Sequence, residues 1–330
     1  MLIQVVYFTD NGNSIFDRLV ANCPEDLFTA KSKNQSLDDW VKTGFETHLP
    51  IVFIGATGIA VRAISPYVEN KLTDSPVIVI DELGQFVISI LSGHVGGANA
   101  LAEKLAKALG ATPVITTATD LNNVFAIDAF AEKNGLRILD KNQIKKVSSK
   151  LLKKESIVIK NEIENIVFEG EQPKNVIISN DAKDYDVLIT DKEKDEDCLV
   201  LIPRKTILGM GCKKDKPFEE LLDFVTKHYD IDDLRKDIYA ITSIDVKAKE
   251  KGLLTLAAFL DTWLITFSAE ELEKVTGDFS TSDFVKKTVG VDNVSERAAV
   301  ILGATLTKEK CAENGMTLAE AVRDIRSFVW

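Results

Sequence analysis

Short apolar runs and amphipathic stretches alternate along the first 120 residues of the chain. The apolar runs predict strands over Ile3–Phe8, Ile51–Ile54, Val77–Ile80, Phe86–Leu91 and Val114–Thr116. The amphipathic stretches predict helices over Asp38–His48, Ala60–Val68 and Ala98–Leu109, because their apolar residues recur at the spacing of one helical face. Alternation of strands and helices predicts a mostly parallel sheet that is covered on both faces.

The pattern changes after Asp120 and resumes at Arg204. Between them, short β-type runs occur at Ile157–Lys160, Asn165–Phe168, Val176–Ser179 and Asp186–Thr190, and the charge cluster Asp191–Asp197 predicts a solvated turn. Later strands are expected over Thr206–Met210, Ile238–Ile244 and Trp263–Ser268. Later helices are expected over Phe218–Tyr229, Glu250–Leu260, Ala269–Val275, Thr281–Lys287, Ser295–Leu302 and Leu318–Arg326. We predict an N-terminal α/β domain of residues 1–120, a smaller middle α/β segment of 121–203, and a C-terminal α/β domain of 204–330.

Composition and charge exclude several classes of protein. The chain carries 40 basic and 51 acidic residues, a net charge of −11, and no segment has the basic excess of a nucleic-acid-binding surface. Its apolar runs are far shorter than a membrane span. Four cysteines without a CxxC pair and three histidines argue against a metal centre built by the protein. We therefore expect a cytoplasmic protein with reduced thiols, no nucleic-acid partner and no membrane partner.

The segment Leu91–Asn99 (LSGHVGGAN) combines chemistry that occurs nowhere else in the chain. It follows a predicted strand and enters a predicted helix, where main-chain N–H groups and the helix dipole attract carboxylates or phosphates. Its glycines let the backbone turn sharply and let a ligand approach, although tight packing alone also uses glycine this way. His94 lies inside this loop and can exchange a proton near neutral pH, or it can simply cap the loop.

Other polar residues follow the predicted strands. Asp81 and Glu82 come after Val77–Ile80 and can orient His94, activate water, or start a turn. Thr57, Gly58 and Arg62 follow Ile51–Ile54, and Ile115–Asp120 adds three hydroxyl groups and a carboxylate. We expect these polar strand ends to converge on one edge of the sheet.

The C-terminal segment has a similar glycine turn. Gly209 and Gly211 end a predicted strand, and Lys247 and Glu250 follow the next one. Cys212 lacks a neighbouring base in the sequence, so a small buried thiol beside the turn is the favoured interpretation.

These motifs together resemble the CbiG family. SGHVGGAN (Ser92–Asn99) followed by VITTATD (Val114–Asp120) is the specific part, and GATGIAVRAISP (Gly55–Pro66) agrees with it. The weaker C-terminal matches fall in the family's order: GMGCK at Gly209, IDVKAKEKG at Ile244, FSAEEL at Phe267 and GVDNVSERAA at Gly290. The resemblance covers about residues 50–120 and 205–327. Asp74-Ser75-Pro76 and Asp215-Lys216-Pro217 depart from the family pattern.

The resemblance implies a cobalt-precorrin-5A hydrolase of anaerobic cobalamin biosynthesis, whose substrate is a cobalt-bearing, carboxylate-rich tetrapyrrole with a δ-lactone. The cobalt arrives in the substrate, so no further metal or cofactor is expected. His94 is the expected base for water, with Glu82 supporting it. Residues expected to bind the substrate are Thr57, Gly58, Arg62, Ser92, Gly93, Gly96, Gly97, Asn99, Thr117, Asp120, Gly209, Gly211, Lys247 and Glu250. A macrocycle of this size is expected in a cleft between the first and last domains.

Two alternatives remain open at this point. A non-catalytic tetrapyrrole carrier would use the same carboxylate-binding features. A nucleotide- or sugar-phosphate-binding enzyme would need a lysine and an acidic ribose partner that the glycine turns lack. A homodimer and contacts with other enzymes of the pathway are further expectations.

Overall fold

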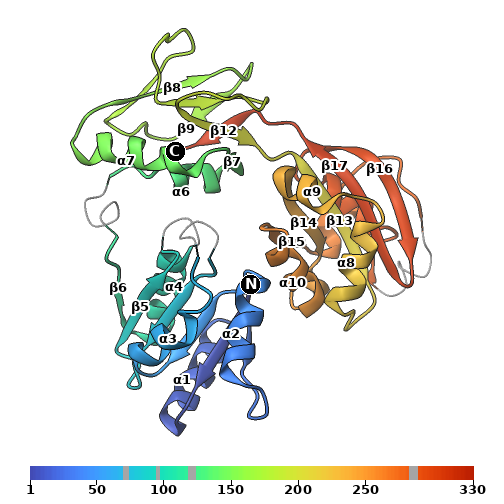
Figure 1. The fold of residues 1–330 in the computed structure, drawn as a ribbon. Coiled ribbons are helices and arrows are strands. Elements are labelled where there is room, and N and C mark those ends of the chain that lie inside the picture. The colour runs from blue at the N-terminus through green and yellow to red at the C-terminus, as the bar shows by residue number, and fades with distance from the viewer. Residues whose placement is uncertain (70–73, 94–96, 118–123, 282–288) are drawn as a thin grey trace.

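The computed structural model describes residues 1–69, 74–93, 97–117, 124–281 and 289–330. The described residues form three larger sheets with their own helices, which we name the N-terminal, middle and C-terminal sheets by their order in the sequence, and a further sheet of two strands. Figure 1 shows the N-terminal sheet at the bottom, the middle sheet at the top and the C-terminal sheet on the right. This confirms the prediction of a multidomain α/β protein with mostly parallel sheets.

The N-terminal sheet has six strands in the order β2-β1-β3-β4-β5-β6. Strands β2, β1, β3 and β4 are parallel, β5 runs antiparallel to β4, and β6 is parallel to β5. The elements are β1 (Leu2–Tyr7), α1 (Asp10–Asn22), β2 (Leu27–Ala30), α2 (Leu37–Glu46), β3 (Ile51–Ile54), α3 (Thr57–Ile64), β4 (Val77–Ile80), β5 (Phe86–Leu91), α4 (Ala98–Leu109) and β6 (Thr112–Val114).

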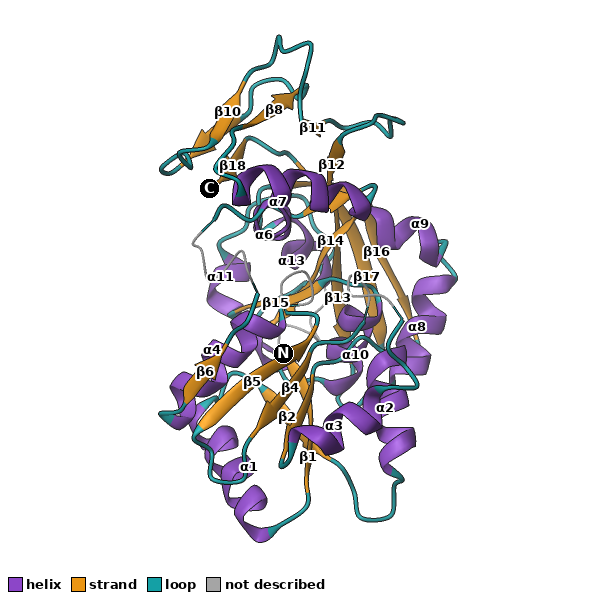
Figure 2. Ribbon diagram, turned by 60° about the vertical axis from the view of Figure 1, so that its left-hand side comes forward, coloured by secondary structure: helices purple, strands orange, loops and turns teal. Residues whose placement is uncertain are grey.

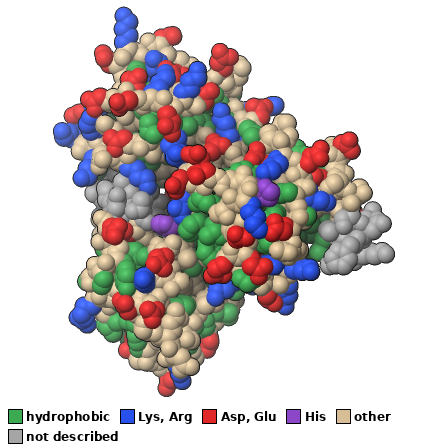
Figure 3. Space-filling view, turned by 45° about the vertical axis from the view of Figure 1, so that its right-hand side comes forward, with side chains coloured by type: hydrophobic (Ala, Val, Ile, Leu, Met, Phe, Trp, Pro, Cys, Tyr) green, Lys and Arg blue, Asp and Glu red, His purple; other side chains and the backbone are tan. Residues whose placement is uncertain are grey.

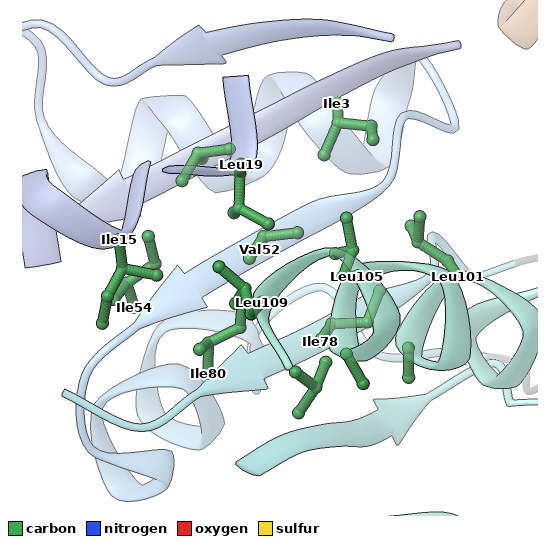
Figure 4. Packing of buried hydrophobic residues seen from close by; sticks show 14 of the residues in the cluster. Ile3, Ile15, Leu19, Val52, Ile54, Ile78, Ile80, Leu101, Leu105 and Leu109 are labelled. Atoms are coloured by element: carbon green, nitrogen blue, oxygen red, sulfur yellow. The ribbon is translucent and has the colours of Figure 1, made fainter. Parts of the chain in front are cut away.

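Alternate residues of the central strands face opposite layers of this block. Ile3, Val52 and Ile78 point towards α1 and α4, and Figure 4 shows them packed against Leu101 and Leu105 of α4. Phe53 and Val79 point towards α2 and α3 on the other face. The all-apolar β3 and β4 are therefore buried on both sides, as parallel strands under two helical layers require.

The middle sheet has the order β10-β8-β11-β12-β7, with only β7 antiparallel to its neighbour. Helices α6 and α7 cover one face of it. The elements are α6 (Ile127–Lys133), β7 (Leu136–Ile138), a 3₁₀ turn (Lys141–Gln143), α7 (Ile144–Leu152), β8 (Ile157–Asn161), β9 (Val167–Glu169), β10 (Val176–Ile178), β11 (Val187–Ile189) and β12 (Leu199–Pro203).

The C-terminal sheet has the order β15-β14-β13-β17-β16. Strands β15, β14 and β13 are parallel to one another, β17 is antiparallel to β13, and β16 is antiparallel to β17. Its elements are β13 (Thr206–Cys212), α8 (Phe218–Thr226), α9 (Ile231–Asp237), β14 (Ile238–Ile244), a 3₁₀ turn η2 (Asp245–Lys247), α10 (Lys251–Phe259), β15 (Trp263–Phe267), α11 (Ala269–Glu273), α13 (Ser295–Val300), β16 (Ala304–Glu313) and β17 (Met316–Arg323).

One predicted helix of this segment is wrong. The range Leu318–Arg326 falls mostly in strand β17, which pairs with β13 on one side and β16 on the other. Pairing on both sides overrides the helix propensity of its Ala and Glu residues. The predicted helix Thr281–Lys287 lies almost entirely outside the described residues.

Contacts between the sheets include an apolar cluster and a strand pairing. Leu2 and Leu49 at the start of β1 and β3 pack against Leu254 of α10, so the amino ends of the N-terminal strands face the C-terminal block. At the other end of the chain, β18 (Ser327–Val329) leaves the C-terminal block and pairs with β9 of the middle segment. Figure 2 shows this last segment beside the middle sheet, where Phe328 is fully buried.

Candidate active site

The turn between β5 and α4 is built around Ser92 and Gly93. Ser92 is buried and has φ = 56°, a left-handed conformation that is rare for a residue with a side chain. Its hydroxyl donates to the carbonyl oxygen of Asp74 at 2.7 Å, and its own carbonyl accepts the N–H of Ala98 at 3.1 Å. These bonds fix the strained serine to the amino end of β4 and to the start of the helix.

Gly93 and Asn99 close the turn from the other side. The N–H of Asn99 donates to the carbonyl of Gly93 at 2.8 Å. A Cβ on Gly93 would lie only 2.7 Å from Oδ1 of Asn99, so the glycine makes room for the amide. The Asn99 Nδ2 donates to Oγ1 of Thr117 at 2.9 Å. This buried amide therefore ties the carboxyl ends of β5 and β6 together.

Gly97 begins helix α4 with φ = 76°, and a Cβ there would meet nothing within 4 Å. Glycine is required at this position by its backbone conformation, not by a crowded neighbour. Helix α4 is 12 residues long and begins directly after Gly97. Its positive dipole end therefore lies at the same sheet edge as Ser92 and Thr117. His94, Gly96 and Asp120 fall outside the described residues, and their roles stay predictions.

The expected convergence of the polar strand ends is wrong. Because β5 runs antiparallel to β4, Gly93 and Thr117 lie at one edge of the sheet, whereas Glu82 lies at the other. The six residues of β5, at about 3.3 Å each, separate the two edges by about 20 Å. Thr57, Gly58 and Arg62 follow the carboxyl end of β3, on the Glu82 side. Glu82 therefore does not support the Ser92–Asn99 loop.

Asp81 and Glu82 instead belong to the turn between β4 and β5. The Asp81 carboxylate accepts hydrogen bonds from the main-chain N–H groups of Leu83, Gln85 and Phe86. Glu82 is exposed. The sequence left a catalytic role or a turn start open for this pair. The structure shows that Asp81 starts a turn.

The two C-terminal glycines contact protein. A Cβ on Gly209 would lie 1.8 Å from the Ser295 carbonyl oxygen, and one on Gly211 would lie 2.7 Å from Oγ1 of Thr317. Their missing side chains let helix α13 and strand β17 approach β13 closely, and Gly209 is buried. No ligand can reach Gly209 while α13 is in place, so substrate binding by this residue is not compatible with the fold.

Lys247 and Glu250 form an ion pair at the carboxyl end of β14. Their charged atoms are 2.8 Å apart, and only 13% and 7% of their side chains are exposed. The lysine charge is thus already balanced inside the protein. Cys212 lies nearby and half-buried, and burial raises the pKa of its thiol to about 11, with Lys247 opposing this and Glu250 adding to it. A neutral structural thiol is the state that these surroundings favour.

The Ser92–Thr117 edge is the one turned towards the rest of the molecule. Leu2 and Leu49 lie at this same edge, because it carries the amino ends of β1 and β3, and both contact Leu254. In Figure 1 the start of α4 and the end of β5 point towards the middle block. A ligand bound at this edge would therefore meet more than one block, as the predicted interdomain site requires.

Sequence reasoning missed Asp74. Its carbonyl holds Ser92, and its Oδ1 accepts the N–H of Glu69 at 3.2 Å. The Asp74-Ser75-Pro76 triplet before β4 was the available signal, since Asx residues before proline start turns. Asn99 and Thr117 were both predicted to bind the substrate, and the structure shows that they are hydrogen-bonded to each other.

Figure 3 shows acidic and basic side chains interspersed over one face of the molecule. Within the described residues, a single cluster of three metal-ligating groups occurs, formed by Cys23, Glu25 and Asp26. Lys104 lies 3.0 Å from Glu25 and 2.5 Å from Asp26, so an ammonium group already occupies this cluster.

None of the described helices has the length and apolarity to cross a membrane.

Comparisons with known proteins match most of the chain. Family models described as cobalamin synthesis G N-terminal and C-terminus match residues 39–120 and 206–321. A solved structure of a cobalamin biosynthesis protein G homologue from Sulfolobus solfataricus aligns with 98% of this chain and 97% of its own, at 25% identity and a TM-score of 0.45. A cobalt-precorrin-5A hydrolase from Priestia megaterium is 30% identical over 80% of this chain and 75% of its own. Another, from Salmonella typhimurium, is 34% identical over 97% of both chains. Because this last match spans nearly the full length of both proteins, the chain belongs to the CbiG, or cobalamin synthesis G, family.

Proposed function

We propose that the chain hydrolyses the δ-lactone of cobalt-precorrin-5A and releases acetaldehyde, giving cobalt-precorrin-5B in anaerobic cobalamin biosynthesis. The observation that carries this proposal is the 34% identity to a cobalt-precorrin-5A hydrolase over 97% of both chains. The described ends of the SGHVGGAN motif support it, because Ser92 has a positive φ and is bonded to Asp74 and Ala98 at the edge facing the other blocks.

The reaction has two bond-breaking steps. Water adds to the lactone carbonyl carbon, and the acyl C–O bond then breaks to give a carboxylic acid and an alkoxide. The alkoxide collapses to the aldehyde, which breaks the C–C bond to the macrocycle and leaves a carbanion equivalent that takes a proton. Water supplies the acid oxygen and both protons, so no oxidant or reductant is needed. The site must therefore provide a base, donors for an oxyanion and a proton for carbon.

The Ser92–Thr117 edge can meet part of this requirement. The N-terminus of α4 lies at this edge. Its positive dipole end would stabilise the lactone oxyanion or a peripheral carboxylate there. The bonds of Ser92 to Asp74 and of Asn99 to Thr117 hold the turn in place before the substrate arrives. Asn99 thereby acts as a positioning residue. We assign the base role to His94, because its ordinary pKa near 6.5 suits proton exchange at neutral pH.

The revised geometry narrows the substrate-binding set. We propose Ser92, Gly93, Gly97 and Thr117 as the described part of the site, because they share one edge. Thr57, Gly58 and Arg62 lie at the opposite edge, and a macrocycle held by the Ser92–Thr117 edge would not reach them. Cobalt enters as part of the substrate, and the reaction calls for no additional cofactor. All four cysteines are free thiols, which fits a cytoplasmic enzyme.

The direct test is to incubate the purified protein with cobalt-precorrin-5A and to quantify acetaldehyde with an NADH-coupled alcohol dehydrogenase. We expect stoichiometric acetaldehyde, and a large loss of rate in His94→Ala. Binding of the tetrapyrrole without acetaldehyde would instead identify a carrier. A His94→Ala protein that turns over at the wild-type rate would remove the base assignment but leave the activity in place.

A further inference from the structure

Cys311 and His228 meet on the C-terminal block, away from the Ser92–Thr117 edge. Cys311 lies on β16 and His228 follows α8, and their Sγ and Nε2 atoms are 3.4 Å apart although 83 residues separate them in the sequence. The thiol also donates to the carbonyl of Leu318 at 3.4 Å. The ring of Phe224 stands edge-on to the imidazole at 5.3 Å and fixes its orientation. Both ligand-type side chains are half-buried.

The separation of the two atoms matches that of two ligands on one tetrahedral ion. With Zn–S of about 2.3 Å and Zn–N of about 2.05 Å, the observed 3.4 Å separation subtends an angle of about 103° at the metal. This angle is close to tetrahedral. The two side chains can therefore chelate one ion without moving apart, at the cost of the hydrogen bond from the thiol to Leu318.

The surroundings leave room for the remaining coordination positions. His228 and Tyr229 line an open hollow of about 620 Å³, so water can reach the His228 side of the pair. Both basic and acidic side chains lie nearby. Lys227 is bound to Glu313 at 2.6 Å and to Asp223 at 3.1 Å, which offsets its charge. Lys308 lies 4.8 Å from the centre of the Tyr229 ring.

We propose that Cys311 and His228 form a binding site for one thiophilic divalent metal ion, for which Zn²⁺ is the test ion. The ion is held by Sγ and Nε2 of these residues and completes its shell with water. This site is independent of the lactone-hydrolysing site and does not rest on the proposed function. It would link α8 to β16 and thereby stabilise the C-terminal block.

The test uses the full-length protein without a metal-affinity tag. Zn²⁺ is titrated calorimetrically, and Co²⁺ is added separately because a thiolate–Co²⁺ bond gives a near-ultraviolet charge-transfer band. We expect Cys311→Ser to abolish the band, and both Cys311→Ser and His228→Gln to weaken Zn²⁺ binding by at least the roughly 10–100-fold that loss of an outer-shell partner costs. Cys212→Ser and His48→Gln are the matched controls and should bind as the wild type does.

Three results would overturn the proposal: no charge-transfer band in the wild type, unchanged affinity in either site variant, or equal loss in a control variant. Thermal unfolding gives an independent readout. Saturating Zn²⁺ should raise the melting temperature of the wild type but not that of Cys311→Ser or Cys311→Ala. An equal increase in all three proteins would place the binding elsewhere.

Discussion

Replacing Gly93 by alanine tests how the turn before α4 is held. The new Cβ would lie 2.7 Å from Oδ1 of Asn99, against at least 3.4 Å for an ordinary contact. The Asn99 amide must then move by about 0.7 Å or more, which would break its 2.9 Å bond to Thr117. Gly93 does not have a positive φ, so its backbone accepts alanine, and among the described residues the three atoms nearest the new Cβ all belong to the Asn99 side chain.

The expected cost can be worked out from this contact. Loss of the amide–hydroxyl hydrogen bond costs about 0.5–1.5 kcal/mol, and an off-rotamer asparagine adds about 0.5–1.5 kcal/mol. Gly93→Ala should therefore destabilise the turn by about 1–3 kcal/mol. In an Asn99→Ala background the same change meets no amide. There it should be neutral, or stabilising by about 0.4–1 kcal/mol through the unfolded chain.

A double-mutant cycle with hydrogen–deuterium exchange of helix α4 measures this coupling. Four proteins are compared: the wild type, Gly93→Ala, Asn99→Ala and the double variant. We expect a coupling free energy of about 1–3 kcal/mol and faster exchange at the start of α4 in Gly93→Ala. Equal costs of Gly93→Ala in both backgrounds would refute the reasoning, because the glycine would then be needed for something other than the Asn99 contact.

Three further outcomes follow from the geometry. Glu82→Gln should leave acetaldehyde formation within about twofold, because Glu82 lies at the opposite edge from Gly93; a hundredfold loss, the scale of general acid–base catalysis, would show that the carboxylate takes part. Gly209→Ala should cost about 3 kcal/mol in urea unfolding, because its Cβ would lie 1.8 Å from the Ser295 carbonyl oxygen. Gly58→Ala is the control: its Cβ would meet Arg62 only at 3.6 Å inside helix α3, so it should be neutral or stabilise by up to about 1 kcal/mol. Cys212 should react with iodoacetamide at pH 8 about 100-fold more slowly than a thiol of pKa 9.0, because its pKa of about 11 leaves so little thiolate; a rate equal to that of a free thiol would contradict the burial argument.

Much of the fold could be predicted from apolar periodicity, but strand direction could not. Each of β3, β4 and β5 appears in the sequence as an apolar run, and the structure confirms their residue ranges. The direction of β5 depends on the turn at Asp81–Gln85, where the Asp81 carboxylate binds three main-chain N–H groups and Gly84 has φ = 66°. Two apolar runs joined by five residues with a glycine are a hairpin signal. The prediction treated the sheet as mostly parallel, and it therefore placed Glu82 at the same edge as the Ser92–Asn99 loop, whereas β5 runs antiparallel to β4.

The candidate site was predicted only as far as its motif. SGHVGGAN marks the correct turn, because its glycines and its position between a strand and a helix have a local physical meaning. Whether Asn99 reaches Thr117, and whether Arg62 reaches either, depends on the order and direction of strands across the sheet. Gly209 shows the same limit: a glycine at the end of a strand is compatible with a ligand or with a packed helix, and only the position of α13 decides between them.

Incubation of the purified protein with cobalt-precorrin-5A in H₂¹⁸O tests the proposed hydrolysis most directly. Attack of water on the lactone carbonyl places one ¹⁸O atom in the new carboxyl group of the macrocycle, with one acetaldehyde released for each substrate consumed. We expect mass spectrometry of the product to show this single labelled oxygen. A product macrocycle without ¹⁸O, or one that keeps its two-carbon fragment, would contradict lactone hydrolysis by this protein.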